Sequence, residues 1–219
     1  MKTSYLTILA TFFLISCSKN IDNNIEINQL ITPDYNFSNY FFDCNLNDGS
    51  SLLKLESFLS GFIKNDIFQN TSSYSLKVFF PENDTVDKFK ISIKNYTSND
   101  IFTDVINELS KNGFDAVASC NFNSNLFSGL SLYNYIEIEQ NISNNAEILR
   151  CFYKPGFNYG TFRISLERFI SKLNQLKIQY GIEYFQEELN SGEFIWINYF
   201  YQEDFKNNIS TQWLSDPDS

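Results

Sequence analysis

The same order of predicted elements occurs twice along this chain, and this repeat limits the possible folds more than any other feature. In each half, a strand that contains a cysteine precedes a turn, an amphipathic helix, a two-strand hairpin and a second helix. The segments Phe89–Tyr96 and Phe194–Tyr199 match in position, because each follows the cysteine of its half by a similar distance. We therefore expect a duplicated β-α-β-β-α unit.

The first half is expected to contain a strand at 40–44, a helix with Ser50 or Ser51 as its N-cap, strands at 74–80 and 89–96, a helix capped by Ser98, and a strand at 114–120. The first of these helices is predicted from its apolar stripe, because Leu52, Leu55, Leu59 and Phe62 recur at helical spacing. The second ends at Asn112-Gly113, since glycine is common just after a helix.

The second half is expected to contain a strand at 148–153, a turn at 154–160, a helix capped by Thr161, strands at 180–188 and 194–201, and a final helix at about 202–214. Residues 123–147 fit the repeat poorly. Alternating apolar and polar residues in Leu132–Glu139 predict that this segment is a linker or an extra edge strand.

The order β-α-β-β-α resembles the split βαβ, ferredoxin-like arrangement. Two such units whose antiparallel sheets meet face to face resemble the dimeric α/β barrel family, which includes antibiotic-biosynthesis monooxygenases and stress-responsive barrel proteins. The resemblance covers about residues 40–214. It implies an α+β fold in which a first unit at 40–122 and a second at 148–214 pack as an intramolecular pseudo-dimer.

The N-terminus has the pattern of an export signal. Lys2 supplies a positive charge, and the apolar run Tyr5–Ile15 is shorter than the about 20 residues that span a bilayer. It ends in Leu14-Ile15-Ser16-Cys17, which resembles the leader of a bacterial lipoprotein, here residues 1–16. This resemblance implies acyl chains on Cys17 and, with Ser18 next, retention in the outer membrane facing the periplasm. Residues 17–39 are expected to be a tether and residues 215–219 a tail.

The formal net charge of -10 and the absence of histidine exclude several classes of function. Phosphate backbones and anionic lipids repel an acidic chain, so we expect no nucleic-acid partner and a membrane contact made by the lipid anchor alone. Without histidine, the usual general base and the commonest metal and haem ligand are missing. We therefore expect no metal and no cofactor, and the haem chemistry of the barrel family cannot be assigned to any residue.

Four cysteines are present, and a lipid on Cys17 leaves Cys44, Cys120 and Cys151. One disulfide with one buried thiol is compatible with an oxidising compartment, and so are three buried thiols.

Two segments are candidates for a binding site. Trp196 and Asn198 lie on one predicted strand and point to the same side, as a cofactor-free monooxygenase would require; packing in the core is the competing interpretation for Trp196. Phe157, Asn158 and Tyr159, in the turn before the second-half helix, could face a pocket or a partner, unless the turn geometry alone requires them. No residue is assigned a catalytic role.

These features predict a non-enzymatic, lipid-anchored envelope protein that binds a small apolar ligand or an envelope protein partner. The alternative is a cofactor-free monooxygenase-like enzyme of the dimeric α/β barrel type. A ligand-sized cavity lined by Trp196 and Asn198 would favour ligand binding or catalysis, whereas a filled core with aromatic residues outside would favour protein interaction.

Overall fold

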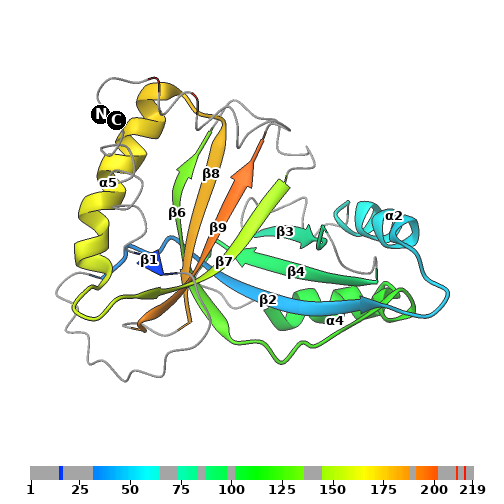
Figure 1. Ribbon diagram of the computed structural model, residues 1–219. Helices are drawn as coiled ribbons and strands as arrows, with labels where there is room; N and C mark the ends of the chain where they lie inside the picture. The colour runs from blue at the N-terminus through cyan, green and yellow to red at the C-terminus, as the bar shows by residue number, and fades with distance from the viewer. Residues whose placement is uncertain are drawn as a thin grey trace. The chain divides into compact units, whose positions relative to one another are not determined.

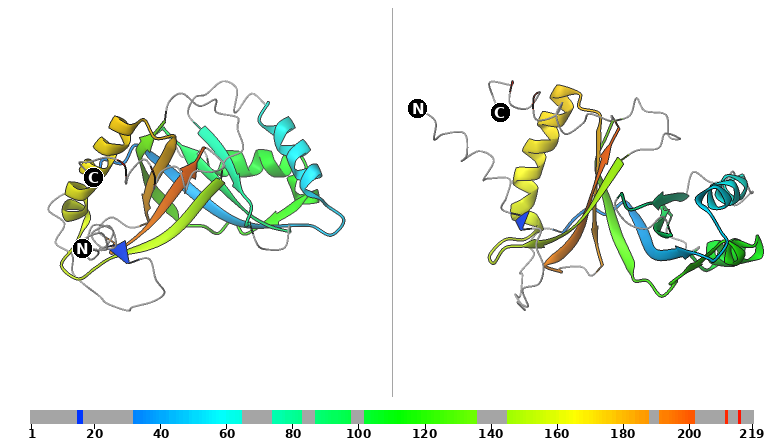
Figure 2. Two further views of the ribbon diagram at one scale, coloured as in Figure 1. Left: turned by 45° about the horizontal axis from the view of Figure 1, so that its top comes forward. Right: turned by 45° about the vertical axis from the view of Figure 1, so that its right-hand side comes forward.

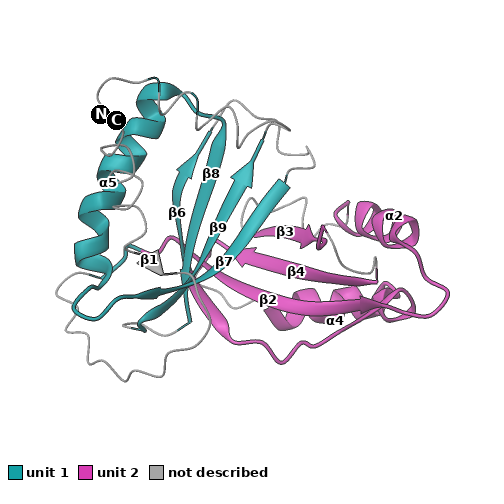
Figure 3. Cartoon of the chain, viewed as in Figure 1, with its two compact units in different colours: residues 1–34, 129–219 teal, residues 35–128 magenta. Residues whose placement is uncertain are grey.

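The computed structural model describes residues 15–16, 32–64, 74–82, 87–97, 102–135, 145–187 and 191–201, with Thr211 and Ser215. The chain divides into two compact units, which Figure 3 distinguishes by colour. Unit 1 comprises residues 1–34 and 129–219, and unit 2 comprises residues 35–128. Unit 2 combines an antiparallel sheet with several helices, and the described part of unit 1 combines one with a single long helix, so the fold is α+β (Figure 1).

Unit 2 contains β2 (Phe37–Leu46), α2 (Leu52–Phe62), β3 (Tyr74–Phe79), β4 (Lys88–Asn95), α4 (Phe102–Lys111), the 3-10 helix η1 (Phe114–Ala116), β5 (Ala118–Cys120) and the start of β6 (Leu126–Asn134). The pairs β5–β2, β2–β4 and β4–β3 are antiparallel and give the order β5-β2-β4-β3. The first strand of the unit therefore lies beside the third, and the third lies beside the second.

Local sequence explains how the elements of unit 2 begin and end. Ser51 is the N-cap of α2, as one of the two predicted alternatives, and its hydroxyl accepts a hydrogen bond from the Lys54 amide at 3.3 Å. The predicted strand at 114–120 is wrong in its first half. Gly113 has φ of 90°, in the left-handed region that glycine adopts more easily than other residues. The chain then forms η1 and buries Phe114 completely before β5 begins at Ala118.

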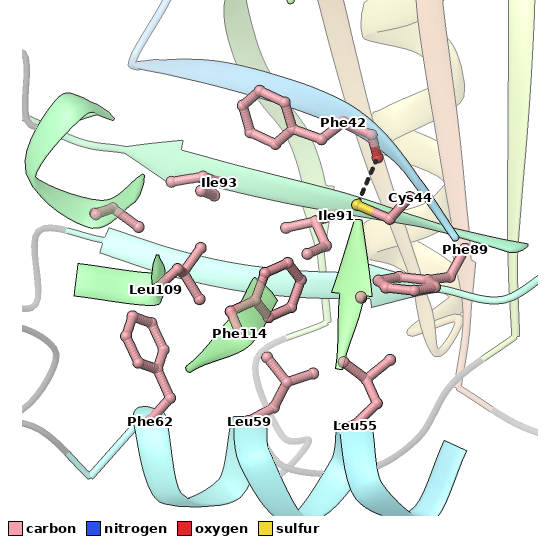
Figure 4. Packing of buried hydrophobic residues seen from close by; sticks show 12 residues of the cluster. Phe42, Cys44, Leu55, Leu59, Phe62, Phe89, Ile91, Ile93, Leu109 and Phe114 are labelled. Carbon is pink, nitrogen blue, oxygen red and sulfur yellow. Dashed lines mark hydrogen bonds between the residues drawn. The ribbon is translucent and has the colours of Figure 1, made fainter. Parts of the chain in front are cut away.

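The core of unit 2 lies between its sheet and the buried faces of its helices (Figure 4). Leu55 and Leu59 of α2 contribute side chains opposite Ile91 of β4, with Phe114 of η1 among them. The dashed line in Figure 4 joins the Cys44 sulfur to the Phe42 carbonyl oxygen at 3.8 Å. Because this sulfur belongs to a disulfide and carries no hydrogen, we interpret that approach as a packing contact.

Cys44 and Cys120 are directly opposite each other on β2 and β5 and form a disulfide, with their Cα atoms 4.1 Å apart. The alternative of three buried thiols is therefore wrong. Cys151 also takes part in a disulfide, and its partner lies outside the described residues.

Unit 1 contains β1 (Ile15–Ser16), the rest of β6, β7 (Asn145–Tyr153), α5 (Tyr159–Leu176), β8 (Tyr180–Gln186) and β9 (Glu193–Phe200), with the strand order β1-β7-β9-β8-β6. In Figures 1 and 2, α5 runs along one face of this sheet. The strand β6 lies within the segment for which a linker or an edge strand is predicted. The predicted final helix lies outside the described residues, apart from Thr211, which is helical.

The N-cap of α5 is Asn158, and the prediction of Thr161 is wrong by one turn. The Asn158 side chain accepts a hydrogen bond from the Thr161 amide at 3.0 Å, and the Thr161 hydroxyl accepts one from the Asn158 amide at 3.0 Å. This reciprocal pair is a capping box, so Thr161 supports the helix start as its third residue.

The two units share their pairing register. Phe89 lies opposite Cys44 where β4 pairs with β2, and Phe194 lies opposite Cys151 where β9 pairs with β7. The order first-third-second occurs in both units, since β9 lies between β7 and β8. Each position of one sheet therefore has an equivalent in the other.

Candidate functional site

The candidate site lies on the sheet face of unit 1 that α5 covers, which we call the helix-side face. The Phe162 ring of α5 is 5.9 Å from the Trp196 ring, which places this side of β9 under the helix. Asn198 is two residues further along β9 and points to the same side, because side chains alternate along a strand. Trp196 and Asn198, both predicted as site residues, therefore belong to one face.

A polar network of four side chains is centred on Asn198. Its Oδ1 accepts hydrogen bonds from Trp196 Nε1, at 2.5 Å, and from the Tyr180 hydroxyl. Its Nδ2 donates to Glu147 Oε2 at 3.0 Å. The network connects β7, β8 and β9, and both lone pairs of the Asn198 carbonyl are used, so the amide orientation is fixed.

Burial decreases towards one end of the network. Asn198, Trp196 and Tyr180 are 7%, 9% and 8% exposed. Glu147 is half-buried, as is Leu149, the cross-strand partner of Trp196. The buried amide is thus connected to a carboxylate that solvent can reach.

Tyr180 is a hydrogen-bond donor at neutral pH. Burial raises the pKa of its hydroxyl well above the ordinary value of 10, and the Glu147 carboxylate raises this pKa further, while the contact with Trp196 lowers it. The proton therefore stays on Tyr180 and points to the Asn198 carbonyl oxygen.

Aromatic rings continue the site along the helix-side face. The rings in contact there are those of Tyr153, Tyr159, Phe162, Tyr184, Phe194 and Trp196. The hydroxyls of Tyr153 and Tyr184 are 2.9 Å apart and form a hydrogen bond, which satisfies two buried polar groups. On the other side of the network, the Phe200 ring stacks on Tyr180 with centroids 5.6 Å apart.

The equivalent positions of unit 2 carry isoleucine and tyrosine, with no amide and no carboxylate among them. The shared register aligns Asn198 with Ile93, Trp196 with Ile91, Glu147 with Tyr40 and Tyr180 with Tyr74. There, Phe102 of α4 stacks on Tyr40 at 4.1 Å and Phe42 at 5.2 Å, and it covers the sheet. The polar network is therefore a feature of unit 1, which the repeated fold does not require.

The other predicted site residues lie at the start of α5. Tyr159 is buried, with its ring 5.5 Å from Tyr184, so it belongs to the aromatic cluster. Asn158 uses its side chain as the helix cap, and Phe157 is exposed. Cys17 lies outside the described residues.

Other candidate features of the described residues are less distinctive. In those ranges, no group of three His, Cys, Asp or Glu side chains could hold a metal ion. No helix there combines the length and apolarity that a membrane crossing requires. An open hollow on the outer side of α5 is lined by Ile164, Glu167, Arg168, Ser171, Lys172 and Gln175. Since most of these side chains are polar, we interpret it as the solvent-facing surface of the helix.

Comparisons with known proteins give little further information. No family model matches the chain, and no curated protein matches its sequence. Among solved structures, the chain is similar to a crystal structure described as a chlorite dismutase candidate, with a TM-score of 0.48 and 10% identity. The alignment covers 83% of this chain and 87% of that one. A similarity of this degree carries no conclusion about function.

Proposed function

We propose that this protein is a non-enzymatic, lipid-anchored envelope protein that binds a small apolar ligand on the helix-side face of unit 1. The observation that carries the proposal is the polar network on Asn198, in which Asn198, Trp196 and Glu147 occupy the positions of Ile93, Ile91 and Tyr40 in unit 2. Buried polar networks need complete hydrogen bonding and fix one geometry, so their placement is specific. Leu149, Phe162 and Phe200 supply apolar surface around it.

A cofactor-free monooxygenase is the second candidate, because Trp196 and Asn198 lie together on one face, as the predicted enzyme would require. The Asn198 carbonyl already accepts two hydrogen bonds, however, and its amide nitrogen donates to Glu147. The Asn198 carbonyl oxygen therefore has no lone pair left for a substrate. We prefer ligand binding for this reason.

We infer that the two units form the pseudo-dimer that a dimeric α/β barrel implies. The shared strand order and register support this arrangement. An experimental structure in which the two sheets do not face each other would overturn the inference.

The ligand site can be tested with 2-phenylethanol, a neutral aromatic probe. Trp196 fluorescence would be recorded in a Trp213→Phe background, so that one tryptophan reports. We expect a saturable change at about millimolar concentrations, the usual range for so small a ligand. Leu149→Ala should weaken binding about fivefold, because it removes apolar contact area beside Trp196.

Ile148→Ala is the matched control for this measurement. Ile148 is the adjacent residue of β7 and points to the opposite face of the sheet. Its truncation should leave the affinity for 2-phenylethanol unchanged. Equal loss in both variants, or no saturable signal in the parent protein, would refute the site.

The lipid anchor is supported by the Cys44–Cys120 disulfide, because disulfides persist in oxidising compartments such as the periplasm. Protein from bacterial membranes should partition into detergent, and Cys17→Ala should move it to the aqueous phase. The structure places Cys151 in a disulfide, and because Cys44 and Cys120 pair with each other, a lipid on Cys17 would exclude that second disulfide. After denaturation, the lipidated chain should therefore give one titratable thiol, whereas a chain with both disulfides should give none. Detergent partitioning of Cys17→Ala, or a chain with no titratable thiol, would contradict the anchor.

A further inference from the structure

At its accessible end, the polar network presents a hydrogen-bond acceptor. The single N–H of Trp196 and the single O–H of Tyr180 both donate to Asn198. Glu147 accepts one hydrogen bond from Asn198 through Oε2, which leaves Oε1 as an acceptor at the half-buried end. No Lys or Arg of the described residues forms an ion pair with Glu147.

The surrounding aromatic rings attract a cation, as the Glu147 carboxylate does. Tyr180 and Trp196 are members of the network, and the Phe200 ring stacks on Tyr180. The faces of aromatic rings attract cations, most strongly for tryptophan. In unit 2, this chain already places the Lys94 ammonium 4.2 Å from the Phe37 ring centroid. The net charge of -10 adds a long-range attraction for cations.

We propose that the ligand of this site carries a cationic amine, whose ammonium group donates to Glu147 Oε1 while its apolar part packs against Leu149 and the neighbouring rings. This inference rests on the proposed function and names the ligand class of the same site. A carboxylate or phosphate in that position would face the Glu147 carboxylate and the negative ring faces together.

Three probes of nearly equal shape test the proposal: 2-phenylethylamine, 2-phenylethanol and phenylacetate. They would be titrated against the Trp213→Phe protein at pH 7 and fixed salt, with Trp196 fluorescence as the signal. We expect the amine to bind about tenfold more tightly than the alcohol, which is a modest value for a charge-assisted hydrogen bond. Phenylacetate should bind most weakly.

Glu147→Gln should reduce the preference for the amine over the alcohol to about twofold or less, because the amide keeps an acceptor oxygen but removes the charge. The alcohol should bind as before, since its contacts are unchanged. Glu193→Gln is the matched control: Glu193 is exposed at the start of β9, and its replacement makes the same change in net charge. It should preserve the tenfold preference.

The outcomes separate this inference from the proposed function. If none of the probes binds, both are refuted. If the three probes bind equally well, or phenylacetate binds best, the ligand site stands and the amine proposal is overturned. If Glu193→Gln lowers the preference as much as Glu147→Gln does, the selectivity comes from net charge, and the role of Glu147 is refuted.

Discussion

Removing the Cys44–Cys120 disulfide is expected to lower the free energy of unfolding by about 2–4 kcal/mol. The bond joins residues separated by 76 positions, so it strongly restricts the unfolded chain. It also attaches β5, a strand of three residues, to β2. Urea unfolding of the Cys44→Ala/Cys120→Ser double variant measures the loss. The m-value should rise as well, because an unfolded chain without this link exposes more surface.

A reducing agent provides the control for this variant. The parent protein in dithiothreitol should lose at least as much stability as the double variant without it. The double variant should respond to dithiothreitol only through the disulfide at Cys151. If reduction leaves the parent protein as stable as before, the disulfide contributes nothing to the folded state, and the expected loss is wrong.

Local signals predict much of this fold. The helix stripe of Leu55, Leu59 and Phe62 is the buried face of α2, and the N-cap Ser51 is one of the two positions that the sequence predicts. The similar distance from the first-strand cysteine to the third strand in both halves predicts the repeat, and strand pairing shows that the two halves also share one register.

Sequence reasoning fails where tertiary packing decides the local structure. Alternation and apolar content predict a strand from Phe114, but burial of the Phe114 ring after a left-handed Gly113 favours a 3-10 turn. Both Asn158 and Thr161 have the chemistry of an N-cap, and the capping box uses both. Propensity alone does not distinguish the cap from its partner.

The candidate site is predictable only in part for a similar reason. Trp196 and Asn198 are two residues apart on one strand, so the pleat alone places them together. Tyr180 and Glu147 have no such local signal. Glu147 reaches Asn198 from 51 residues away, through the register of β7 on β9, and a one-residue shift of that register would turn Glu147 to the other face.

Asn198→Leu is expected to destabilise the protein by about 3 kcal/mol, although leucine has nearly the same size and unit 2 has isoleucine at the equivalent position. The substitution leaves two buried donors, Trp196 Nε1 and the Tyr180 hydroxyl, without their acceptor. Each buried donor without a partner costs about 1–3 kcal/mol. Urea unfolding measures this loss, and we expect the m-value to stay unchanged.

Tyr180→Phe shows whether these groups act as one network. In the parent protein, the substitution removes a donor and leaves the Asn198 carbonyl with one hydrogen bond fewer. In the Asn198→Leu background, the same substitution removes a donor that has already lost its acceptor, so it should cost less or even stabilise the protein. The resulting double-mutant cycle should give a coupling of about 1 kcal/mol or more. Additive effects would mean that Tyr180 and Asn198 contribute independently. The four side chains would then not form a cooperative network that distinguishes unit 1 from unit 2.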